Sequence, residues 1–572
     1  MMSYLLVAAI DFGTTFSGWA FSFKHDFERD PTKITAKNWH GDQLISQKAP
    51  TCVLIKPDGR TFDSFGYTAE SKYAELVAEE KHEQWYFFRR FKMMLFDKIE
   101  DACGKQLSAK KVFSMVIKFL KDDLLEECSN QLGDSINDKD VKWVLTVPAI
   151  WNDVAKQFMR EAAIKAGIMK EHLLIALEPE AASIFCRHLP VDKAEGEEEV
   201  SLASMKAGTK YMVVDAGGGT VDITFHQVIV DDKLREIHKA SGGAWGGTRI
   251  DDEYEKFLDS LFGQDIMKKF QKQNMDDYFD MMRAFEIKKR DLKLKGANKV
   301  TIRIPPSLID IVQENRGKQL KDIITESKYN GNITYVSGKI RVYPELLIAL
   351  FKDTVAKIIK HMNSLLQEEK CHDCSTIVLA GGFAESYILQ EAIRDAFKGM
   401  RLIIPNGTGL VVLKGAVIFG HRPATIVERV CRYSYGLKGS HRTSEECKHP
   451  PTKTTEGKDG IKRCKNLFKI YARCGETVEL TEERSTYLGC PRYDDQTNIG
   501  YTIYASENEN PLLTTEDKCF ELGRLKIPIS DTSFGRNRLF EKSFIFGDTE
   551  IIVKVVDKVS KEVYLLSVNC LE

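Results

Sequence analysis

Two short segments of the chain combine an aspartate with glycines and threonines in a pattern suited to binding phosphate. Asp11-Phe-Gly-Thr-Thr15 follows the apolar run Leu5–Ile10, and Asp215-Ala-Gly-Gly-Gly-Thr-Val-Asp222 follows the apolar run Tyr211–Val214. Glycine lets backbone N–H groups approach phosphate oxygens, threonine hydroxyls add donors, and a carboxylate can hold Mg²⁺ directly or through water. A single turn of this kind is usually structural, because Asp and Gly are ordinary turn residues. Two copies in similar contexts are a much more specific signal.

The residues around each turn predict a β-hairpin that would position it. Each apolar run is typical of a short buried strand, and a second β-like stretch follows the turn, at Gly18–Phe23 and at Val221–Val230. A third apolar run, Ser375–Ala380, leads into Gly381-Gly382. The repetition predicts a duplicated α/β unit.

Long stretches with helical periodicity separate these strands, at Val112–Glu127, Asp153–Gly167 and Leu347–Leu366. Strands that alternate with helices predict a mixed or parallel sheet covered on both faces. The acidic run Glu195–Glu199 is expected to be a solvated loop. The α/β pattern ends near Pro423.

The chain after Pro423 predicts a mainly-β domain. Residues 439–464 are rich in Lys, Thr, Pro, Glu and Gly, which favours a mobile loop. Alternating apolar residues predict strands at Phe468–Ala472, Gly500–Ala505, Leu525–Ile529, Glu550–Val556 and Val563–Val568. We therefore expect an α/β domain over residues 1–425, with lobes at about 1–205 and 206–425, and a small β-rich domain over 426–572.

Three other phosphate-binding patterns are missing from the sequence. Asp11-Phe-Gly13 copies the magnesium motif of protein kinases, but no Gly-rich loop or His-Arg-Asp loop precedes it. Neither Gly217–Gly219 nor Gly242–Gly247 has the spacing of a Rossmann fingerprint. A Walker pattern would need Ser or Thr after a Gly-Lys pair, which is not the case at Gly104-Lys105, Gly317-Lys318, Gly338-Lys339 or Gly457-Lys458. The interpretation with two hairpins remains.

Composition excludes several classes of partner. The 572 residues include 82 Lys and Arg against 83 Asp and Glu, a net charge of -1, so no global field would attract nucleic acid or an anionic membrane. Leu5–Ile10 is too short for a signal-peptide core, and no segment reaches the ~18 apolar residues of a membrane span. We expect a cytosolic protein without membrane insertion, whose thirteen cysteines are mostly reduced.

The motifs resemble those of the 70-kDa heat-shock protein family, within the actin and hexokinase superfamily. The similar segments span about residues 5–425 and are Asp11–Ser17, Thr146–Asp153, Glu178–Ala182, Asp215–Asp222, Gly246–Asp251, Glu286–Arg290 and Ala380–Gly382. Trp85–Phe96, Gly382–Ser386 and Tyr433–Gly436 are most similar to the divergent heat shock 70 kDa protein 12 branch. The resemblance implies a two-lobed, actin-like ATPase domain with duplicated α/β lobes.

The resemblance also implies roles for individual residues. Asp11 and Asp215 would face each other across a cleft and organise hydrated Mg²⁺, and Glu178 would lie near the metal or the attacking water. The implied catalytic set is Asp11, Glu178, Asp215 and Thr220. The residues implied around the β- and γ-phosphates of ATP or ADP are Gly13, Thr14, Thr15, Gly217, Gly218, Gly219 and Thr220. Those implied around the nucleoside are Gly246, Gly247, Glu286, Lys289, Arg290, Gly381 and Gly382, with Arg290 stacked on the base. Without the resemblance, Glu286, Lys289 and Arg290 would be interpreted as a solvated helix face.

The sequence departs from the family pattern at several positions. The family's catalytic lysine should fall near Glu70, where the nearest lysine is Lys72. Lys293, Glu385 and Gly409 replace a serine, an arginine and an aspartate near the nucleoside, so adenine preference is less secure than phosphate binding. The family's acidic linker has no equivalent in Gly420–Gly436, and its helical lid is absent. The resemblance therefore does not imply allosteric peptide clamping.

Two further features have plainer interpretations. Cys371-His-Asp-Cys374 has zinc or redox spacing, but no second Cys-x-x-Cys pair completes a site, so an inert loop is favoured. The basic and aromatic run Trp85–Phe96 could stack on bases, but aromatics at helical spacing are more often core.

The leading hypothesis is a chaperone-like protein that binds Mg-ATP between its lobes and engages protein clients or partners, with possible co-chaperones, through its β domain. Slow ATP hydrolysis is expected to depend on phosphate positioning. A nucleotide-gated scaffold with negligible turnover is the alternative, motivated by the missing lysine. A small-molecule kinase of the same superfamily is a third possibility, which the C-terminal β domain disfavours.

Overall fold

The structure of the chain is a computed structural model, which describes residues 4–41, 45–95, 97–133, 135–189, 205–294, 298–443, 454–547 and 550–567. The acidic run Glu195–Glu199 lies outside the described residues. The chain divides into two compact units that are interleaved in sequence. Unit 1 comprises Met1–Ile150, Met159–Thr224 and Ser241–Arg422, and unit 2 comprises Trp151–Phe158, Phe225–Ala240 and Pro423–Glu572.

The first sheet of unit 1 is built around a fully buried strand that ends in Asp11. Its main strand order is β13-β12-β1-β2-β3, with bounds β1 Leu6–Asp11, β2 Phe16–Phe23, β3 Thr35–Ala36, β12 Val141–Val147 and β13 Leu173–Leu177. β1 runs parallel to β12 and antiparallel to β2, with Asp11 opposite Gly18. Because both faces of β1 are covered, its sequence is continuously apolar and does not alternate.

The second sheet repeats the first. Its strands follow the order β21-β20-β14-β15, with bounds β14 Lys210–Ala216, β15 Val221–Val228, β20 Thr376–Ala380 and β21 Arg401–Ile403. β14 runs parallel to β20 and β20 runs parallel to β21, as β1, β12 and β13 do in the first sheet. The predicted duplication and the actin-like, two-lobed α/β fold class are confirmed.

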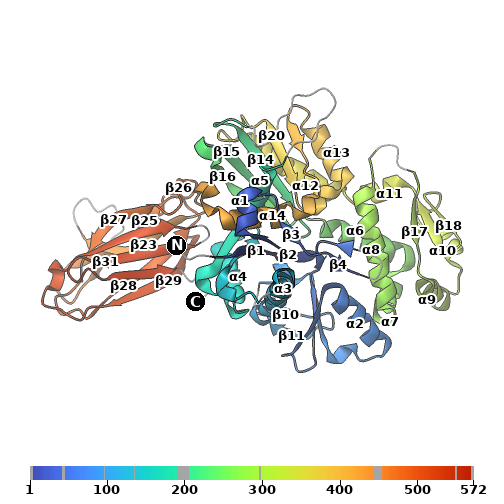
Figure 1. Ribbon diagram of the computed structural model, residues 1–572, viewed down its shortest axis with the longest axis horizontal. Helices are drawn as coiled ribbons and strands as arrows, with labels where there is room; N and C mark the ends of the chain where they lie inside the picture. Colours follow the sequence, from blue (N-terminus) through green and yellow to red (C-terminus); the bar gives the residue numbers. More distant parts are fainter. Residues whose placement is uncertain are drawn as a thin grey trace. The chain divides into compact units, whose positions relative to one another are not determined.

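The helices of unit 1 pack on these two sheets, on the smaller sheets described below and on one another (Figure 1). Their bounds are α1 Lys24–Arg29, α2 Gly66–Ala78, α3 Ala109–Leu132, α4 Asp153–Lys165, α5 Glu178–Cys186, α6 Thr248–Phe262, α7 Gln264–Gln273, α8 Met275–Asp291, α12 Lys352–Leu366, α13 Tyr387–Ala396 and α14 Thr408–His421. α14 packs against α5 and β1. The approach of α14 to α5 needs a glycine, because a Cβ on Gly415 would lie 1.7 Å from the carbonyl oxygen of Ala181. The two lobes of unit 1 are thus joined by closely packed helices.

Smaller elements complete unit 1. A three-stranded sheet joins β8 Phe62–Phe65, β7 Cys52–Ile55 and β9 Tyr86–Arg89, and another joins β17 Val300–Arg303, β19 Lys339–Val342 and β18 Ile333–Val336. Short pairs are formed by β2 with β6 Ala49–Pro50, β4 Trp39–His40 with β5 Ile45–Ser46, and β10 Lys98–Glu100 with β11 Gln106–Ser108. The remaining helices are α9 Pro306–Arg316, α10 Leu320–Glu326 and α11 Pro344–Ala349.

Unit 2 consists mainly of two antiparallel sheets around one apolar core. The first has the order β24-β25-β23-β28-β29, with bounds β23 Ser434–Arg442, β24 Thr454–Glu456, β25 Lys462–Ala472, β28 Asn498–Ser506 and β29 Cys519–Pro528 (Figure 1). The second has the order β27-β30-β31-β32, with bounds β27 Glu483–Gly489, β30 Phe540–Phe546, β31 Ile551–Asp557 and β32 Val563–Ser567. Tyr435, Ile503 and Phe544 are among the residues that form the shared core.

A third group of strands in unit 2 joins β16 Leu234–Gly243, of which Leu234–Ala240 belong to this unit, to β22 Ile426–Val430 and β26 Thr477–Glu479. Among the described residues after Arg422 there is no α-helix, in keeping with the prediction of a β domain without a helical lid.

Three local predictions need correction. Residues 439–464, predicted as a mobile loop, are partly β structure, because β23 extends to Arg442, β24 covers Thr454–Glu456 and β25 begins at Lys462. The helix predicted over Leu347–Leu366 is two helices, α11 and α12, separated at Leu350-Phe351. The helical spacing ascribed to Trp85–Phe96 is also wrong, because the run forms β9 and a short 3-10 turn at Phe91–Met93, and Phe96 lies outside the described residues. Its interpretation as core is confirmed for Phe87, Phe88 and Phe91, which are buried. Within the described part of the chain, no helix is long and apolar enough to cross a membrane.

Candidate functional site

The two Asp-Gly turns line the same cavity, which lies within unit 1 and has a volume of about 550 Å³. That volume is within the range of small-molecule sites. Fourteen of the predicted site residues line it, namely Asp11, Gly13, Thr14, Thr15, Glu178, Asp215, Gly217, Gly218, Gly219, Thr220, Glu286, Arg290, Gly381 and Gly382. The structure therefore gathers residues from both lobes around one pocket.

Three predicted residues do not line this cavity. Gly247 and Lys289 line a smaller adjoining cavity of about 40 Å³. Gly246 lies behind the second Asp-Gly turn, where its N–H donates to the carbonyl of Gly219 and a Cβ would lie 2.3 Å from the carbonyl oxygen of Gly218. These residues support the loop that faces the pocket.

The two glycine turns touch each other through threonine side chains. A Cβ on Gly218 would lie 1.6 Å from Thr15 Oγ1, and a Cβ on Gly219 would lie 2.5 Å from Thr14 Oγ1. Side chains at these two positions would push the turns apart. The glycines therefore bring backbone N–H groups and threonine hydroxyls together at one end of the pocket, which is the arrangement suited to phosphate.

Asp11 is held at this end by two donors. Thr146 Oγ1 donates to Asp11 Oδ1 at 2.7 Å, and Lys48 Nζ lies 2.5 Å from Asp11 Oδ2. Burial by itself would raise the pKa of Asp11, but the charges of Lys48 and Lys92 and the hydrogen bonds from Lys48 and Thr146 outweigh it and lower the pKa. Asp11 is thus a buried carboxylate that stays ionised.

Glu178, the first residue of α5, forms a second buried ion pair. Its Oε1 lies 2.5 Å from Nζ of Lys92, and the Lys92 side chain is only 3% exposed. Burial, with repulsion from Asp11 and Asp222, raises the pKa of Glu178 to about 7 despite the attraction of Lys92. A carboxylate with a pKa near neutrality can accept or release a proton at physiological pH.

Asp215 lacks such a partner. Among the residues that the structure describes, it forms no ion pair, and burial together with repulsion from Glu178, Asp222 and Asp11 raises its pKa well above the usual range. Asp222, in turn, accepts the backbone N–H of Ile150 at 2.8 Å. The phosphate end therefore has an excess of buried carboxylates over lysines, which favours a bound cation.

The opposite end of the pocket is framed by charged side chains of α8 and its neighbours. Arg290 donates to Glu286 Oε1 at 3.0 and 3.2 Å and to Glu385 Oε2 at 2.6 Å. Glu286 and Arg290 thus face the site rather than solvent alone. Lys293 does not line the pocket, and its ammonium instead lies 5.1 Å from the ring centre of Tyr387.

A further network ties β9 to the helices of the second lobe. Asp251 accepts from Arg90 at 2.8 Å and from Lys289 at 2.7 Å. Arg90 has φ 54°, a left-handed conformation that non-glycine residues rarely adopt, and this bend directs the chain into the 3-10 turn that carries Lys92. The strained bend thus helps to place a lysine in the pocket.

No lysine occupies the position near Glu70 where the family resemblance places one, but lysines from other segments line the pocket. Glu70 lines the pocket but pairs with Arg283 at 2.6 Å, and Lys72 pairs with Asp63 at 3.0 Å outside it. The lysines in the pocket are Lys48 and Lys92, neither of which the sequence singled out. Lys92 lies within the aromatic run Trp85–Phe96 together with Arg89 and Arg90, and of these three cations only Lys92 is buried. Sequence alone does not distinguish it from the two arginines.

The carboxylates of the pocket are suited to binding Mg²⁺. Asp11, Asp215 and Glu178 offer carboxylate oxygens, which suit this ion. No group of three or more His, Cys, Asp or Glu in the described part of the chain could hold a metal by itself. Because Mg²⁺ is usually held by one or two carboxylates together with water and substrate phosphates, the residues fit a metal that arrives with a nucleotide.

The cysteine motif carries no comparable chemistry. Cys371 and Cys374 are both buried, and burial raises the pKa of their thiols to about 12 and about 11. Thiols with such high pKa values are poor nucleophiles and poor metal ligands at neutral pH.

Comparisons with known proteins agree with the geometry. The family model described as Hsp70 protein matches residues 42–402. The chain is 35% identical to Heat shock 70 kDa protein 12A of Homo sapiens, over 97% of this chain and 90% of that protein, and 35% identical to Heat shock 70 kDa protein 12B of Homo sapiens, over 97% and 89%. It is also 26% identical to Chaperone protein dnaK1 of Nostoc sp., over 62% of this chain and 44% of that protein.

Proposed function

Because the chain belongs to the Hsp70 protein family, we propose that its unit 1 binds ATP and ADP with Mg²⁺ and hydrolyses ATP slowly. The observation that carries this proposal is the meeting of both Asp-Gly turns in one cavity, with Thr14 and Thr15 against Gly219 and Gly218. The turns suit the β- and γ-phosphates, and the end framed by Arg290 suits the nucleoside. The printed names of the relatives, heat shock protein and chaperone protein, support a chaperone-like role for the whole chain.

Each polar side chain at the phosphate end has a defined task in this proposal. Asp11 and Asp215 orient Mg²⁺ and its waters, and Thr220 and the glycine N–H groups hold phosphate oxygens. When bound, Mg²⁺ would neutralise charge on the phosphates. Glu178 orients the attacking water and accepts its proton, and Lys92 keeps Glu178 in place while its ammonium faces the transferred phosphate.

The presence of Lys92 favours an ATPase over a scaffold without turnover. The scaffold hypothesis was motivated by the missing lysine, and Lys92 supplies that group from another segment. Single-turnover hydrolysis of ATP by the Lys92→Met variant tests this choice. Loss of one donor to a charged transition state should slow hydrolysis about 100- to 1,000-fold, while ATP affinity changes little because many contacts share it.

A matched control is Lys121→Met. Lys121 is also a buried lysine, paired with Asp138 at 3.0 Å, but it lies on α3 outside the pocket. Hydrolysis by this variant should stay within about twofold of that of the unmodified protein. Equal hydrolysis by Lys92→Met and the unmodified protein would contradict the role of Lys92, and negligible turnover of the unmodified protein would favour the scaffold.

Calorimetry with ATP, ADP and GTP, each with and without Mg²⁺, tests the nucleotide itself. We expect ATP and ADP to bind with Mg²⁺. GTP is the critical comparison, because Glu385 and Gly409 stand in the pocket where the family has an arginine and an aspartate. Absence of binding by all three nucleotides would refute the proposal.

For unit 2 we propose binding of protein clients or partners, with co-chaperones as further candidates. The four-stranded sheet β27-β30-β31-β32 has exposed apolar side chains on both of its outer strands, namely Tyr487, Leu488, Val563 and Leu565. Exposed apolar side chains on an outer strand suit an extended polypeptide segment. Binding of a fluorescent apolar peptide by the full chain and by the Val563→Lys, Leu565→Lys double variant would check this. A cytosolic location remains part of the proposal, to be examined by imaging of the tagged chain.

A further inference from the structure

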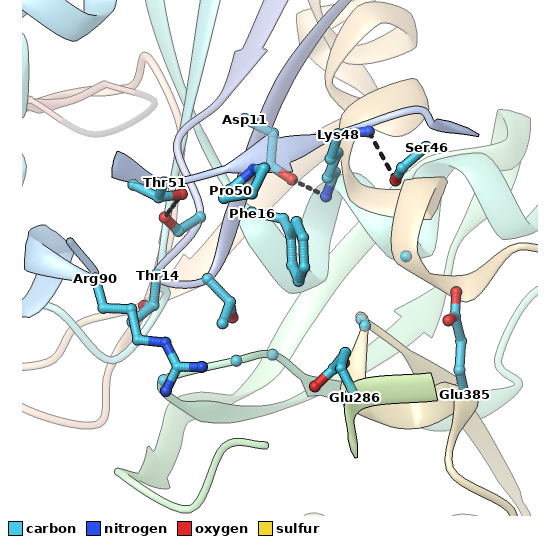
Figure 2. Close-up of a pocket in the computed structure, with 18 of the residues that line it drawn as sticks. Asp11, Thr14, Phe16, Ser46, Lys48, Pro50, Thr51, Arg90, Glu286 and Glu385 are labelled. Atoms are coloured by element: carbon cyan, nitrogen blue, oxygen red, sulfur yellow. Dashed lines mark hydrogen bonds and ion pairs between the residues drawn. The ribbon is translucent and has the colours of Figure 1, made fainter. Parts of the chain in front are cut away.

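Lys48 lines the phosphate end of the pocket, where it pairs with a carboxylate that is also expected to bind a metal. Its ammonium lies 2.5 Å from Asp11 Oδ2, and its side chain is 16% exposed. The stem packs over β2, since a Cβ on Gly18 would lie 3.1 Å from Lys48 Cγ. Figure 2 shows the side chain directed toward Asp11. A lysine is thus built into the place where a cation would meet Asp11.

Because the fold is duplicated, the surroundings of Asp11 can be compared with those of Asp215. Asp11 is the last residue of β1 and Asp215 is the penultimate residue of the equivalent strand β14, and both are 4% exposed. Asp11 has one oxygen occupied by Lys48 and the other by Thr146, whereas Asp215 forms no ion pair with any described residue. The protein therefore supplies a lysine as counter-ion to Asp11. For Asp215, a counter-ion would have to come from a bound ligand.

We propose that Lys48 is an internal counter-cation, which pairs with Asp11 in the ligand-free pocket and with nucleotide phosphate in the bound state. The proposal rests on the proposed function, since it concerns how that nucleotide is held. A lysine suits this role because its ammonium is a point charge on a flexible four-carbon stem, with three donors that can be redirected without moving the backbone.

Two consequences follow for Mg²⁺. A divalent cation must compete with Lys48 for Asp11, so the ligand-free protein should bind such an ion weakly. In the complex, Lys48 supplies part of the positive charge that the phosphates need, so nucleotide affinity should depend less on Mg²⁺ than it would without the lysine. Removing the Lys48 charge should therefore strengthen the coupling between Mg²⁺ and ATP.

The first test is the ratio of the ATP dissociation constant in EDTA to that in Mg²⁺, measured by calorimetry. We expect a ratio of about 10 or less for the unmodified protein, and a ratio at least about tenfold larger for Lys48→Gln, since a charge-assisted hydrogen bond to phosphate is lost only in that variant. Lys48→Arg, which keeps the charge, should remain near the unmodified ratio. Equal ratios for Lys48→Gln and the unmodified protein would overturn the inference.

A matched control is Lys37→Gln, which removes a lysine paired at the same 2.5 Å distance with Asp123 but outside the pocket. Its ratio should equal that of the unmodified protein. If Lys37→Gln shifted the ratio as much as Lys48→Gln, the effect would be a general one of charge and the inference would fail.

The second test needs no nucleotide. Mn²⁺, used as a paramagnetic probe of a divalent site, should bind Lys48→Gln at least about tenfold more tightly than the unmodified protein, because Asp11 is then free of its ammonium partner. Equal or weaker binding of Mn²⁺ by the variant would contradict the proposal. ATP binding with Mg²⁺ but unchanged ratios would refute only the role of Lys48, whereas no ATP binding under any condition would refute the proposed function as well.

Discussion

At the residue scale, the pocket is defined by charges that are costly to bury. Asp11 and Glu178 each pair with a lysine, and Asp222 accepts hydrogen bonds from Thr220 and from the backbone N–H of Ile150. Asp215 forms no ion pair with any described residue. Burial opposes ionisation, which is why the pKa values of Glu178, Asp215 and Asp222 are all raised. The proposed binding of Mg²⁺ together with phosphate would relieve this repulsion.

The contact between the two glycine turns can be tested at Gly218. In Gly218→Val the new side chain would collide with Thr15, so the turns must separate and their N–H groups can no longer converge on phosphate. We expect the ATP-induced rise in Tm to disappear, together with a fall of a few degrees in the Tm of the ligand-free protein. Differential scanning fluorimetry with and without ATP measures both.

Gly399→Ala is the control for this substitution. No heavy atom lies within 4 Å of a Cβ at Gly399, and the residue is outside the pocket. Its ATP-induced shift should match that of the unmodified protein. A full ATP shift in Gly218→Val would show that nucleotide binds elsewhere.

At the element scale, α14 illustrates how packing changes the chemistry of a side chain. The helix ends at His421, whose ring stacks on Phe27 of α1 with centroids 4.0 Å apart. Burial lowers the pKa of His421 to about 4, further helped by the charges of Lys142 and Arg422 and opposed by a hydrogen bond with the backbone of Ser22. Protonation of His421 therefore destabilises the packing at the end of α14.

A pH dependence of stability follows for His421. Its pKa is lower in the folded state than the ~6.5 of an unfolded chain, so the unfolded state binds the proton more readily. The contribution of neutral His421 to the free energy of unfolding is fully present above about pH 6.5 and is lost as the pH falls toward 4. After allowance for partial solvent screening, the loss is on the order of 1 to 2 kcal/mol.

Urea unfolding at pH 7.5 and pH 5 measures this loss. In His421→Phe, the loss of stability between the two pH values should be smaller than in the unmodified protein. His25→Phe, which changes an exposed histidine of the same α1 region, is the control and should retain the full loss. The same pH dependence in His421→Phe and in the unmodified protein would contradict the assignment.

At the scale of the whole molecule, the two units share the chain in an interleaved way. Residues Phe225–Ala240 belong to unit 2, where β16 pairs with β22 and the N–H of Val430 donates to Glu236 at 2.9 Å. The predicted boundary near residue 425 lies close to the start of Pro423–Glu572, but it does not include the earlier segments of unit 2. A chain that ended at residue 422 would therefore lack β22, which pairs with β16, and Val430, which donates to Glu236.

Truncation tests this interdependence. A chain of residues 1–422 removes β22 and leaves the buried carboxylate of Glu236 without the N–H of Val430. A chain of residues 1–432 restores both. We expect the shorter chain to have a Tm at least about 2 °C below that of the longer one, measured by scanning calorimetry. Equal Tm values would show that β22 is dispensable to the preceding residues.

The sequence by itself determined the parts of this protein that depend on local chemistry. Apolar runs that end in Asp11 and Asp215 predict buried strands followed by glycine turns, because backbone preferences and hydrogen bonding within a hairpin act between residues that are close in the chain. The duplicated α/β unit and its two glycine turns could be predicted in this way. The resemblance to the 70-kDa heat-shock proteins added residues that local chemistry did not single out, such as Glu178 and Arg290.

Only the tertiary structure decided which distant side chains complete the site. Lys48 and Lys92 reach Asp11 and Glu178 from segments whose sequence gives no sign of such a contact, and Glu70 turns instead to Arg283. Long-range packing fixes these pairs, since a buried charge must find a partner and the nearest one can come from any segment that the fold brings close. The interleaving of the two units was also beyond the sequence, because strand pairing between β16 and β22 joins residues almost 200 positions apart.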